Sequence, residues 1–189
     1  MKQRQGQHNR LRIIGGEWRR RVLDFAPVPG LRPTPDRVRE TLFNWLQPML
    51  PGARCLDLFA GSGALGWEAA SRGAGRVVLV DSDRRVTRHL ARVREQLGAS
   101  RVEIIEAPAE VYLRGEPQGF DVVFADPPFD SDLLASVLPL LRAPGWLVPQ
   151  ARVYAEFDAR RGLPVLDPAW SVLREGRAGH VGYALLALP

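Results

Sequence analysis

The sequence predicts an α/β fold in which helices cover both faces of a mostly parallel sheet that ends in an antiparallel hairpin. Three observations lead to this fold class. From residue 52 onward, apolar runs typical of strands alternate with segments of helical periodicity. The glycine-rich segment 61–66 directly follows the first of these runs. After Pro168, two strand-like runs follow each other without a helical segment between them.

The first fifty residues are expected to form an extension outside the sheet. Residues 1–9 have no apolar pattern and are expected to be a disordered basic tail. Two short apolar runs on either side of Gly15 and Gly16 predict a small hairpin over residues 11–14 and 21–25.

A helix over residues 35–46 is expected to follow a loop over residues 26–33. Pro35 suits the first turn, where its missing N–H needs no partner, and Thr34 is the expected cap. The chain therefore divides into three parts. These are the tail (1–9), the hairpin and helix extension (10–50) and the main domain (51–189).

The main domain is expected to hold seven strands and four helices. The strands are expected over residues 54–59, 76–80, 101–106, 120–125, 153–157, 170–175 and 181–188. The helices are expected over residues 64–72, 84–97, 109–113 and 131–141. Helical crossovers favour parallel pairing of the first five strands, whereas the short link 176–179 predicts antiparallel pairing of the last two.

The composition of the chain limits the classes of protein to which it can belong. With 189 residues, 46% hydrophobic and 25% charged, the chain is typical of one globular domain. No apolar run approaches the roughly 18–20 residues of a membrane span, and the polar start is unlike a secretory signal. The single Cys55 suits a buried thiol in a reducing compartment. We therefore expect a cytoplasmic monomer without a bound metal or membrane contact.

Positive charge is concentrated at the N-terminal end. Seven basic residues and one glutamate give residues 1–23 a charge of +6, against +5 for the whole chain. A basic segment on a nearly neutral body is typical of polyanion binding. The ring of Trp18 is expected to stack on a base. The arginines expected to neutralise the phosphates of such a polyanion are Arg12, Arg19, Arg20 and Arg21.

The glycine-rich turn indicates a nucleotide-containing ligand. In Gly61-Ser62-Gly63 the glycines let a ligand approach the backbone, and the next helix offers free N–H groups. Asp57, within the end of the first strand, is expected to face a cationic amine or sulfonium. Asp81 ends the second strand, where a carboxylate accepts from ribose hydroxyls. An adenosine ligand with a positive end, such as S-adenosylmethionine, fits these groups.

The motif Asp126-Pro127-Pro128-Phe129 indicates a site for an exocyclic amino group. It follows the apolar run 120–125, and its prolines stiffen the turn. The Asp126 carboxylate and the Pro127 carbonyl are each expected to accept one amine N–H, and Phe129 is expected to stack on the base. In the alternative interpretation, Asp126 only caps a helix and Phe129 only packs in the core.

These two motifs resemble those of S-adenosylmethionine-dependent amino methyltransferases. The upstream segments 12–19 and 30–46 narrow the resemblance to the bacterial 16S rRNA (guanine-N2) methyltransferase family called RsmD, over residues 11–186. The resemblance implies a Rossmann-like class I methyltransferase fold. It also implies S-adenosylmethionine as cofactor and methylation of a guanine N2 amino group in 16S rRNA of the small ribosomal subunit.

The resemblance also implies individual site residues. Cofactor contacts are expected from Asp57, Phe59, Gly61, Ser62, Gly63, Asp81, Ser82, Pro108 and Ala109. Many relatives have Asp or Asn at the position of Pro108, so adenine recognition here is expected to use backbone groups or apolar packing. Three more arginines could contact RNA, close over the cofactor, or pair with Asp36 and Glu40. They are Arg32, Arg37 and Arg39, of which Arg32 is assigned to RNA.

Three other functions fit parts of the sequence. An amino methyltransferase could act on another RNA or on DNA, although the roughly 50 residues outside the sheet are few for a separate target-recognition domain. The spacing Gly61-x-Gly63-x-x-Gly66 also fits a nicotinamide-dependent oxidoreductase. A ribosome-assembly factor that has lost catalysis is the third, and the intact acidic motif residues argue against it.

Overall fold

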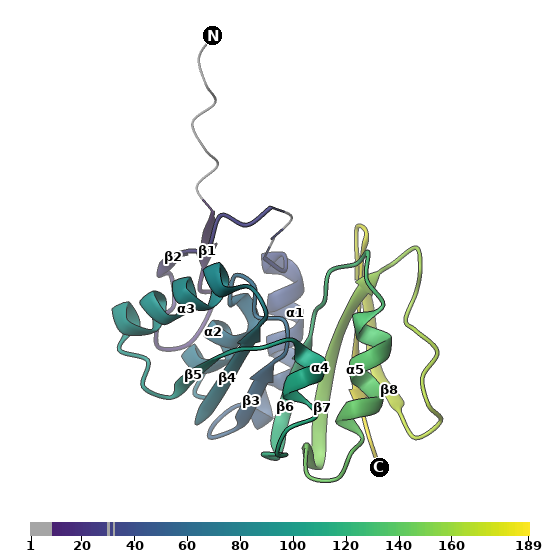
Figure 1. Cartoon of the computed structure of the whole chain (residues 1–189). Coiled ribbons are helices and arrows are strands. Elements are labelled where there is room, and N and C mark those ends of the chain that lie inside the picture. Colours follow the sequence, from purple (N-terminus) through teal and green to yellow (C-terminus); the bar gives the residue numbers. More distant parts are fainter. Residues whose placement is uncertain (1–8, 30, 32) are drawn as a thin grey trace.

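A seven-stranded sheet lies at the centre of the computed structural model, which describes residues 9–29, 31 and 33–189 (Figure 1). The strand order is β5-β4-β3-β6-β7-β9-β8. The strands are β3 Arg54–Asp57, β4 Arg76–Asp81, β5 Val102–Glu106, β6 Phe120–Ala125, β7 Leu147–Asp158, β8 Ser171–Ala178 and β9 Val181–Ala187. Neighbours from β5 to β7 pair in parallel, whereas β9 runs antiparallel to β7 and β8. The predicted sheet is confirmed.

Helices cover both faces of this sheet (Figure 1). They are α1 Asp36–Leu46, α2 Ala64–Ser71, α3 Arg84–Leu97, α4 Ala109–Tyr112 and α5 Leu133–Leu141, with a 3-10 turn η1 Gln47–Met49 after α1. Side chains of α1, α2 and α3 share one core cluster, and those of α4 and α5 share the other. No helix in the described ranges is long and apolar enough to cross a membrane.

The sequence of β4 explains why the sheet needs both layers. Val77 and Leu79 lie in the first core cluster, and Val78 and Val80 lie in the second. All four side chains are fully buried. Because side chains alternate between the two faces of a strand, an uninterrupted apolar run requires cover on both faces.

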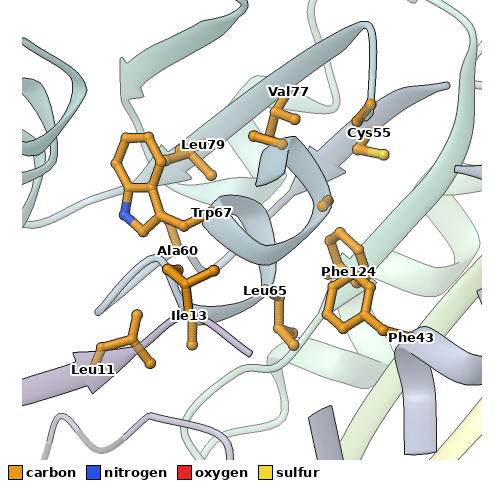
Figure 2. Close-up of a cluster of buried hydrophobic side chains, with 14 of the residues drawn as sticks. Leu11, Ile13, Phe43, Cys55, Ala60, Leu65, Trp67, Val77, Leu79 and Phe124 are labelled. Atoms are coloured by element: carbon orange, nitrogen blue, oxygen red, sulfur yellow. The ribbon is translucent and has the colours of Figure 1, made fainter. Parts of the chain in front are cut away.

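The N-terminal extension packs into the first core cluster. Strands β1 Arg10–Arg12 and β2 Val22–Asp24 pair antiparallel, which confirms the predicted hairpin, with a longer connection than expected. Leu11 and Ile13 lie in the same cluster as Trp67 of α2 and Leu79 of β4 (Figure 2). The hairpin is therefore fixed to the main domain. The predicted tail falls almost wholly on residues 1–8, which lie outside the described residues.

Two strand boundaries differ from the predictions for local reasons. Strand β7 begins six residues early, at Leu147, because its pairing with β6 shifts register near Gln150, whose φ is +65°. Gly176 lies within β8 rather than in the turn. A Cβ there would lie 2.4 Å from Cζ of Tyr183, so the glycine makes room for that ring. The hairpin instead turns at Gly179, whose φ is +63°.

Candidate active site at the carboxyl ends of the parallel strands

The acidic motif residues meet at one edge of the sheet. Strand β3 lies between β4 and β6, so the chain order reverses beside it, and ligands of α/β sheets bind at such a point. In the register, Asp57 lies opposite Leu79 of β4 and Phe124 of β6. Asp81 and Asp126 follow those partners by two residues. The three carboxyl groups therefore lie at the same edge of the sheet, at the carboxyl ends of β3, β4 and β6.

Asp57 holds the glycine turn from beneath. Only 2% of this residue is exposed, and its carboxylate accepts N–H groups of Gly66, at 3.1 Å, and Phe59. Burial raises the pKa of Asp57 to about 7, and the nearby charge of Asp126 contributes. The structure thus shows Asp57 accepting inside the turn, and the expectation that it also faces a ligand cation stays a prediction.

The turn above Asp57 depends on glycine. Gly61 and Gly63 have φ of +51° and +76°, a region that other residues rarely adopt. A Cβ on Gly63 would lie 2.2 Å from Nε1 of Trp67, so a side chain has no room there. Ser62, which is buried, accepts from the N–H of Ala64 at 3.3 Å and closes the start of α2.

Asp81 is fixed beside this turn with acceptor capacity to spare. One carboxylate oxygen accepts the Gly61 N–H at 2.9 Å, and the other accepts the Asp83 N–H at 2.8 Å. Each oxygen keeps a second lone pair, which suits a pair of ribose hydroxyls. Burial raises the pKa of Asp81. Asp83 caps α3, as predicted, because its side chain accepts the Arg85 N–H at 2.8 Å.

The other expected cofactor residues surround the same edge. Phe59 is partly buried against the second core cluster, and Ser82 is exposed. Pro108 is the exposed residue that precedes α4, and Ala109 is buried. The Pro108 carbonyl accepts the N–H groups of Val111 and Tyr112 at 3.0 Å and is therefore used within α4. Adenine recognition through that carbonyl is disfavoured.

Asp126 faces the extension instead of capping a helix. Helix α5 begins only at Leu133, with Asp132 before it, so the capping alternative is wrong. The Thr34 hydroxyl donates to Asp126 at 3.3 Å, and Thr34 makes no capping bond to α1. Pro127 is buried, and within the described residues no backbone N–H donates to its carbonyl. A carboxylate and an open carbonyl thus stand side by side.

A second buried acid, Glu156, lies behind Asp126. The pairing of Ala125 with Ala155 sets Asp126 next to Glu156 across β6 and β7, and their carboxyl groups are within hydrogen-bonding reach. The Tyr154 hydroxyl donates to Glu156 at 2.8 Å. Burial raises the pKa of both acids. The sequence analysis missed Glu156, whose signal was one glutamate in an apolar strand.

Phe129 lies at the rim of the site. Its ring is partly buried against the first core cluster and meets the edge of His180, with ring centroids 6.3 Å apart. Its carbonyl accepts from Arg161 at 3.0 Å. The motif loop is therefore tied to the β8–β9 turn through His180 and to the β7–β8 connection through Arg161, and the Phe129 ring combines core contact with partial exposure.

Of the six expected RNA-binding residues, five lie in the described part of the chain, and they differ in exposure. Arg12, Arg19, Arg20 and Arg21 are exposed on the hairpin. Trp18, by contrast, is only 3% exposed and packs against Trp67 and under the Arg101 guanidinium, so the expectation that its ring stacks on a base is wrong. Burial of a large apolar ring in the core is more favourable in free energy than its exposure to solvent. Arg32 lies outside the described residues.

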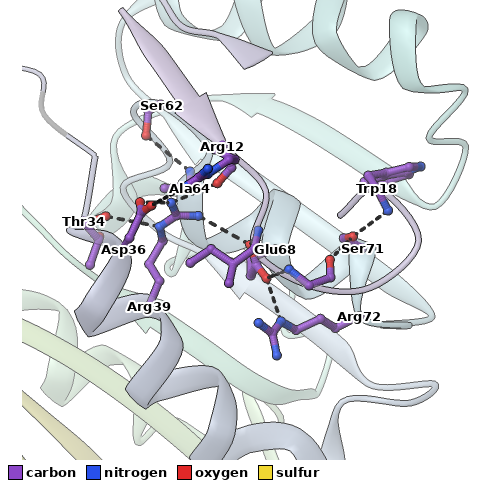
Figure 3. Close-up of polar contacts among 12 residues, drawn as sticks. Arg12, Trp18, Thr34, Asp36, Arg39, Ser62, Ala64, Glu68, Ser71 and Arg72 are labelled. Atoms are coloured by element: carbon purple, nitrogen blue, oxygen red, sulfur yellow. Dashed lines mark hydrogen bonds and ion pairs between the residues drawn. The ribbon is translucent and has the colours of Figure 1, made fainter. Parts of the chain in front are cut away.

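Arg39 joins two segments of the extension to each other and to helix α2 (Figure 3). It is fully buried and donates to the carbonyls of Thr34 and Arg12, at 3.2 and 3.0 Å. It also pairs with Asp36 at 2.6 Å and with Glu68 at 3.4 Å. The pairing alternative is confirmed for Arg39, and its burial excludes contact with RNA. Arg39 thus fixes the backbone that carries the Thr34 hydroxyl.

Glu68 completes this connection from α2. Its carboxylate accepts the N–H groups of Ile14, at 2.9 Å, and Gly15, at 2.7 Å, and pairs with Arg72 at 2.7 Å (Figure 3). These donors offset the free-energy cost of burying the Glu68 carboxylate. The exposed arginines of the hairpin are therefore held at a fixed place relative to the site. In the described part of the chain, no group of three metal-ligating side chains occurs.

Comparisons with known proteins agree with this architecture. "Ribosomal RNA small subunit methyltransferase D" of Escherichia coli K12 is 46% identical over 175 residues, covering 93% of this chain and 88% of that protein. The protein of the same name from Haemophilus influenzae is 42% identical over 181 residues, covering 93% and 92%. The solved structure of yhhF from Escherichia coli matches with a TM-score of 0.85 and 44% identity, covering 94% of this chain and 97% of that one.

The family comparison covers nearly the whole described chain. Residues 11–187 match the model of the family described as "Conserved hypothetical protein 95". This range holds the hairpin, the glycine turn and the motif at Asp126 together. The chain therefore belongs to this family, the RsmD family that its motifs resemble.

Proposed function

We propose that this protein is an S-adenosylmethionine-dependent methyltransferase that modifies the N2 amino group of a guanine in 16S rRNA of the small ribosomal subunit. The observation that carries the proposal is the pair of acceptors, the Asp126 carboxylate and the open Pro127 carbonyl, beside the glycine turn. The printed names of the relatives, which specify ribosomal RNA of the small subunit, support it.

The residues at the glycine turn fit S-adenosylmethionine. Asp81 is held so that each oxygen has a free lone pair for a ribose hydroxyl. Gly61 and Gly63 have no side chains that would keep the ligand away from the backbone. When bound, this cofactor supplies a methyl group on a sulfonium. The residues that would hold it are Phe59, Gly61, Ser62, Gly63, Asp81, Ser82, Pro108 and Ala109. Asp57 contributes by fixing the turn.

The motif at Asp126 prepares the amine for attack. The lone pair of a guanine N2 nitrogen is delocalised into the ring, so the planar amine is a poor nucleophile. When Asp126 and Pro127 each accept one N–H, the nitrogen becomes pyramidal and its lone pair is available. The same acceptors stabilise the positive charge that develops on nitrogen in the transition state. Phe129 holds the base at the rim by stacking.

The exposed hairpin arginines supply the contact with RNA. Arg12, Arg19, Arg20 and Arg21 lie on an element fixed to the main domain, so phosphate contacts there place the target base in register with Asp126. An unpaired guanine in a loop is easier to extrude than a stacked one, which suits a small enzyme without strand-opening elements. We propose that the protein works in the cytoplasm as a monomer.

Methyl transfer from radiolabelled cofactor tests the proposal. The substrates to compare are small ribosomal subunits lacking the modification, free 16S rRNA, an unrelated structured RNA and duplex DNA. We expect the small subunit to be labelled fastest. Preferential labelling of DNA or of the unrelated RNA would favour one of the alternative substrates. If NADH raises the melting temperature and S-adenosylhomocysteine does not, the oxidoreductase alternative is favoured instead.

A further inference from the structure

Glu156 is a buried acid to which the reaction outlined above gives no role. It is 2% exposed and lies in β7 between the buried apolar residues Ala155 and Phe157. Its polar partners are the Tyr154 hydroxyl, the Asp126 carboxyl and the Thr34 hydroxyl. Tyr154 donates its hydroxyl to one Glu156 oxygen at 2.8 Å, and the Asp126 carboxyl lies within hydrogen-bonding reach of it.

The charge balance of this cluster restricts its protonation. Among the described residues, the ion pairs of the protein involve neither Asp126 nor Glu156. The titratable groups that face Glu156 are Tyr154 and Asp126, and Tyr183 and Asp57 lie beyond them. Each of these groups is neutral or an acid. Because Glu156 is buried and no cation pairs with either acid, simultaneous ionisation of the two neighbouring carboxyl groups is strongly disfavoured, and the pair retains one proton.

The hydrogen bonds and the exposure of the two acids indicate which one carries that proton. Asp126 accepts the Thr34 hydroxyl at 3.3 Å and is partly exposed at the site, so its ionised form is solvated. Glu156 lies deeper. With the proton on Glu156, the hydrogen bonds form a directed series: Tyr154 donates to Glu156, Glu156 donates to Asp126, and Asp126 faces the substrate.

We propose that Glu156 is a positioning residue whose protonated carboxyl donates a hydrogen bond to the Asp126 carboxylate and keeps it oriented toward the substrate amine. The inference rests on the proposed function, since it concerns the acceptor in that reaction. Asp126 is then held by two donors, Thr34 from the extension and Glu156 from β7. Its remaining lone pairs are available to the amine.

Two substitutions at Glu156 separate this role from a structural one. Glu156→Gln keeps an oxygen that accepts from Tyr154 and an N–H that donates to Asp126, so it imitates the protonated acid. We expect its kcat to stay within about threefold of wild type and its pH profile to be unchanged. Glu156→Leu removes the donor. Its kcat should fall roughly tenfold to a hundredfold, with cofactor affinity kept.

The pH dependence supplies a readout that a packing defect would not change. Without the donor at position 156, the ionised form of Asp126 loses stabilisation, so the acid limb of kcat/KM in Glu156→Leu should move to higher pH. Glu95→Leu on the exposed face of α3 is the matched control and should leave both kcat and the acid limb unchanged. Thermal melts and cofactor calorimetry confirm that each variant is folded.

Infrared spectroscopy tests the same proposal without substrate. The difference spectrum of wild type minus Glu156→Gln at neutral pH should contain the carbonyl band of a protonated carboxyl group. A carboxylate band instead, an equal loss of activity in the glutamine and leucine variants, or wild-type kinetics in the leucine variant would each overturn the proposal. If wild type itself transfers no methyl group to RNA, the proposed function fails, and the infrared result still decides the protonation of Glu156.

Discussion

Replacement of Asp126 by alanine should separate cofactor binding from catalysis. The substitution removes one of two acceptors for the substrate amine and leaves the glycine turn and Asp81 in place. Loss of one preorganised electrostatic contact to a developing charge lowers turnover by about 10²–10³-fold. We expect that decrease in kcat, with the affinity for S-adenosylmethionine within about threefold of wild type.

Stability should change little in this variant, because two effects oppose each other. The Thr34 hydroxyl loses its partner, which costs about 0.5–1.5 kcal/mol. Removal of the Asp126 charge relieves Asp57, whose ionised form it disfavours. A net change of about 1 kcal/mol in either direction corresponds to about 2–4 °C in Tm for a chain of this size.

The assay is the initial rate of methyl transfer to small subunits at saturating cofactor, with calorimetry for cofactor affinity. Asp126→Asn is the matched comparison, because the amide keeps an acceptor oxygen and loses the charge. Since charge-assisted hydrogen bonds are about twice as strong as neutral ones, we expect about a tenfold loss there. Turnover above one tenth of wild type in Asp126→Ala would refute the reasoning.

Three further predictions concern the cofactor, the RNA and the pH dependence. Asp81→Ala should weaken the binding of S-adenosylmethionine by about 1.5–3 kcal/mol, measured by calorimetry. An unchanged affinity would contradict the assignment of Asp81 to the cofactor site. Replacing Arg19 and Arg21 with Gln should lower the slope of log affinity for small subunits against log salt by about two, whereas a control on β8 should not. That control replaces the exposed Arg174 and Arg177. Because the folded pKa of Asp57 is about 7, above its ordinary 3.8, its burial makes stability fall as pH rises between those values. Asp57→Asn should flatten that decline by up to about 1.4 kcal/mol per pH unit in denaturant titrations, and an identical pH dependence would contradict the assignment.

The sequence predicts the sheet well because its signals are local. The apolar run of β4 and the capping residue Asp83 each specify their element through neighbouring residues alone. The acidic motif residues could be placed together because each follows a parallel strand, and the carboxyl ends of parallel strands meet at one edge.

The missed features depend on partners distant in sequence. Trp18 looks like a free stacking ring until α2 brings Trp67 against it. Thr34 looks like a helix cap, whereas Asp126, 92 residues away, accepts its hydroxyl. Glu156 stands out as a single polar residue, yet its role depends on the pairing of β6 with β7. Contacts of this kind leave no periodic pattern in the chain.

Nucleoside analysis of the product tests the central claim most directly. Small subunits lacking the modification are incubated with the full-length protein and labelled S-adenosylmethionine, and their 16S rRNA is digested to nucleosides. We predict that the label elutes as N2-methylguanosine, at about one methyl group per subunit, and disappears in Asp126→Ala. Label in another nucleoside, or equal labelling by that variant, would contradict the claim that Asp126 and Pro127 present a guanine N2 amine.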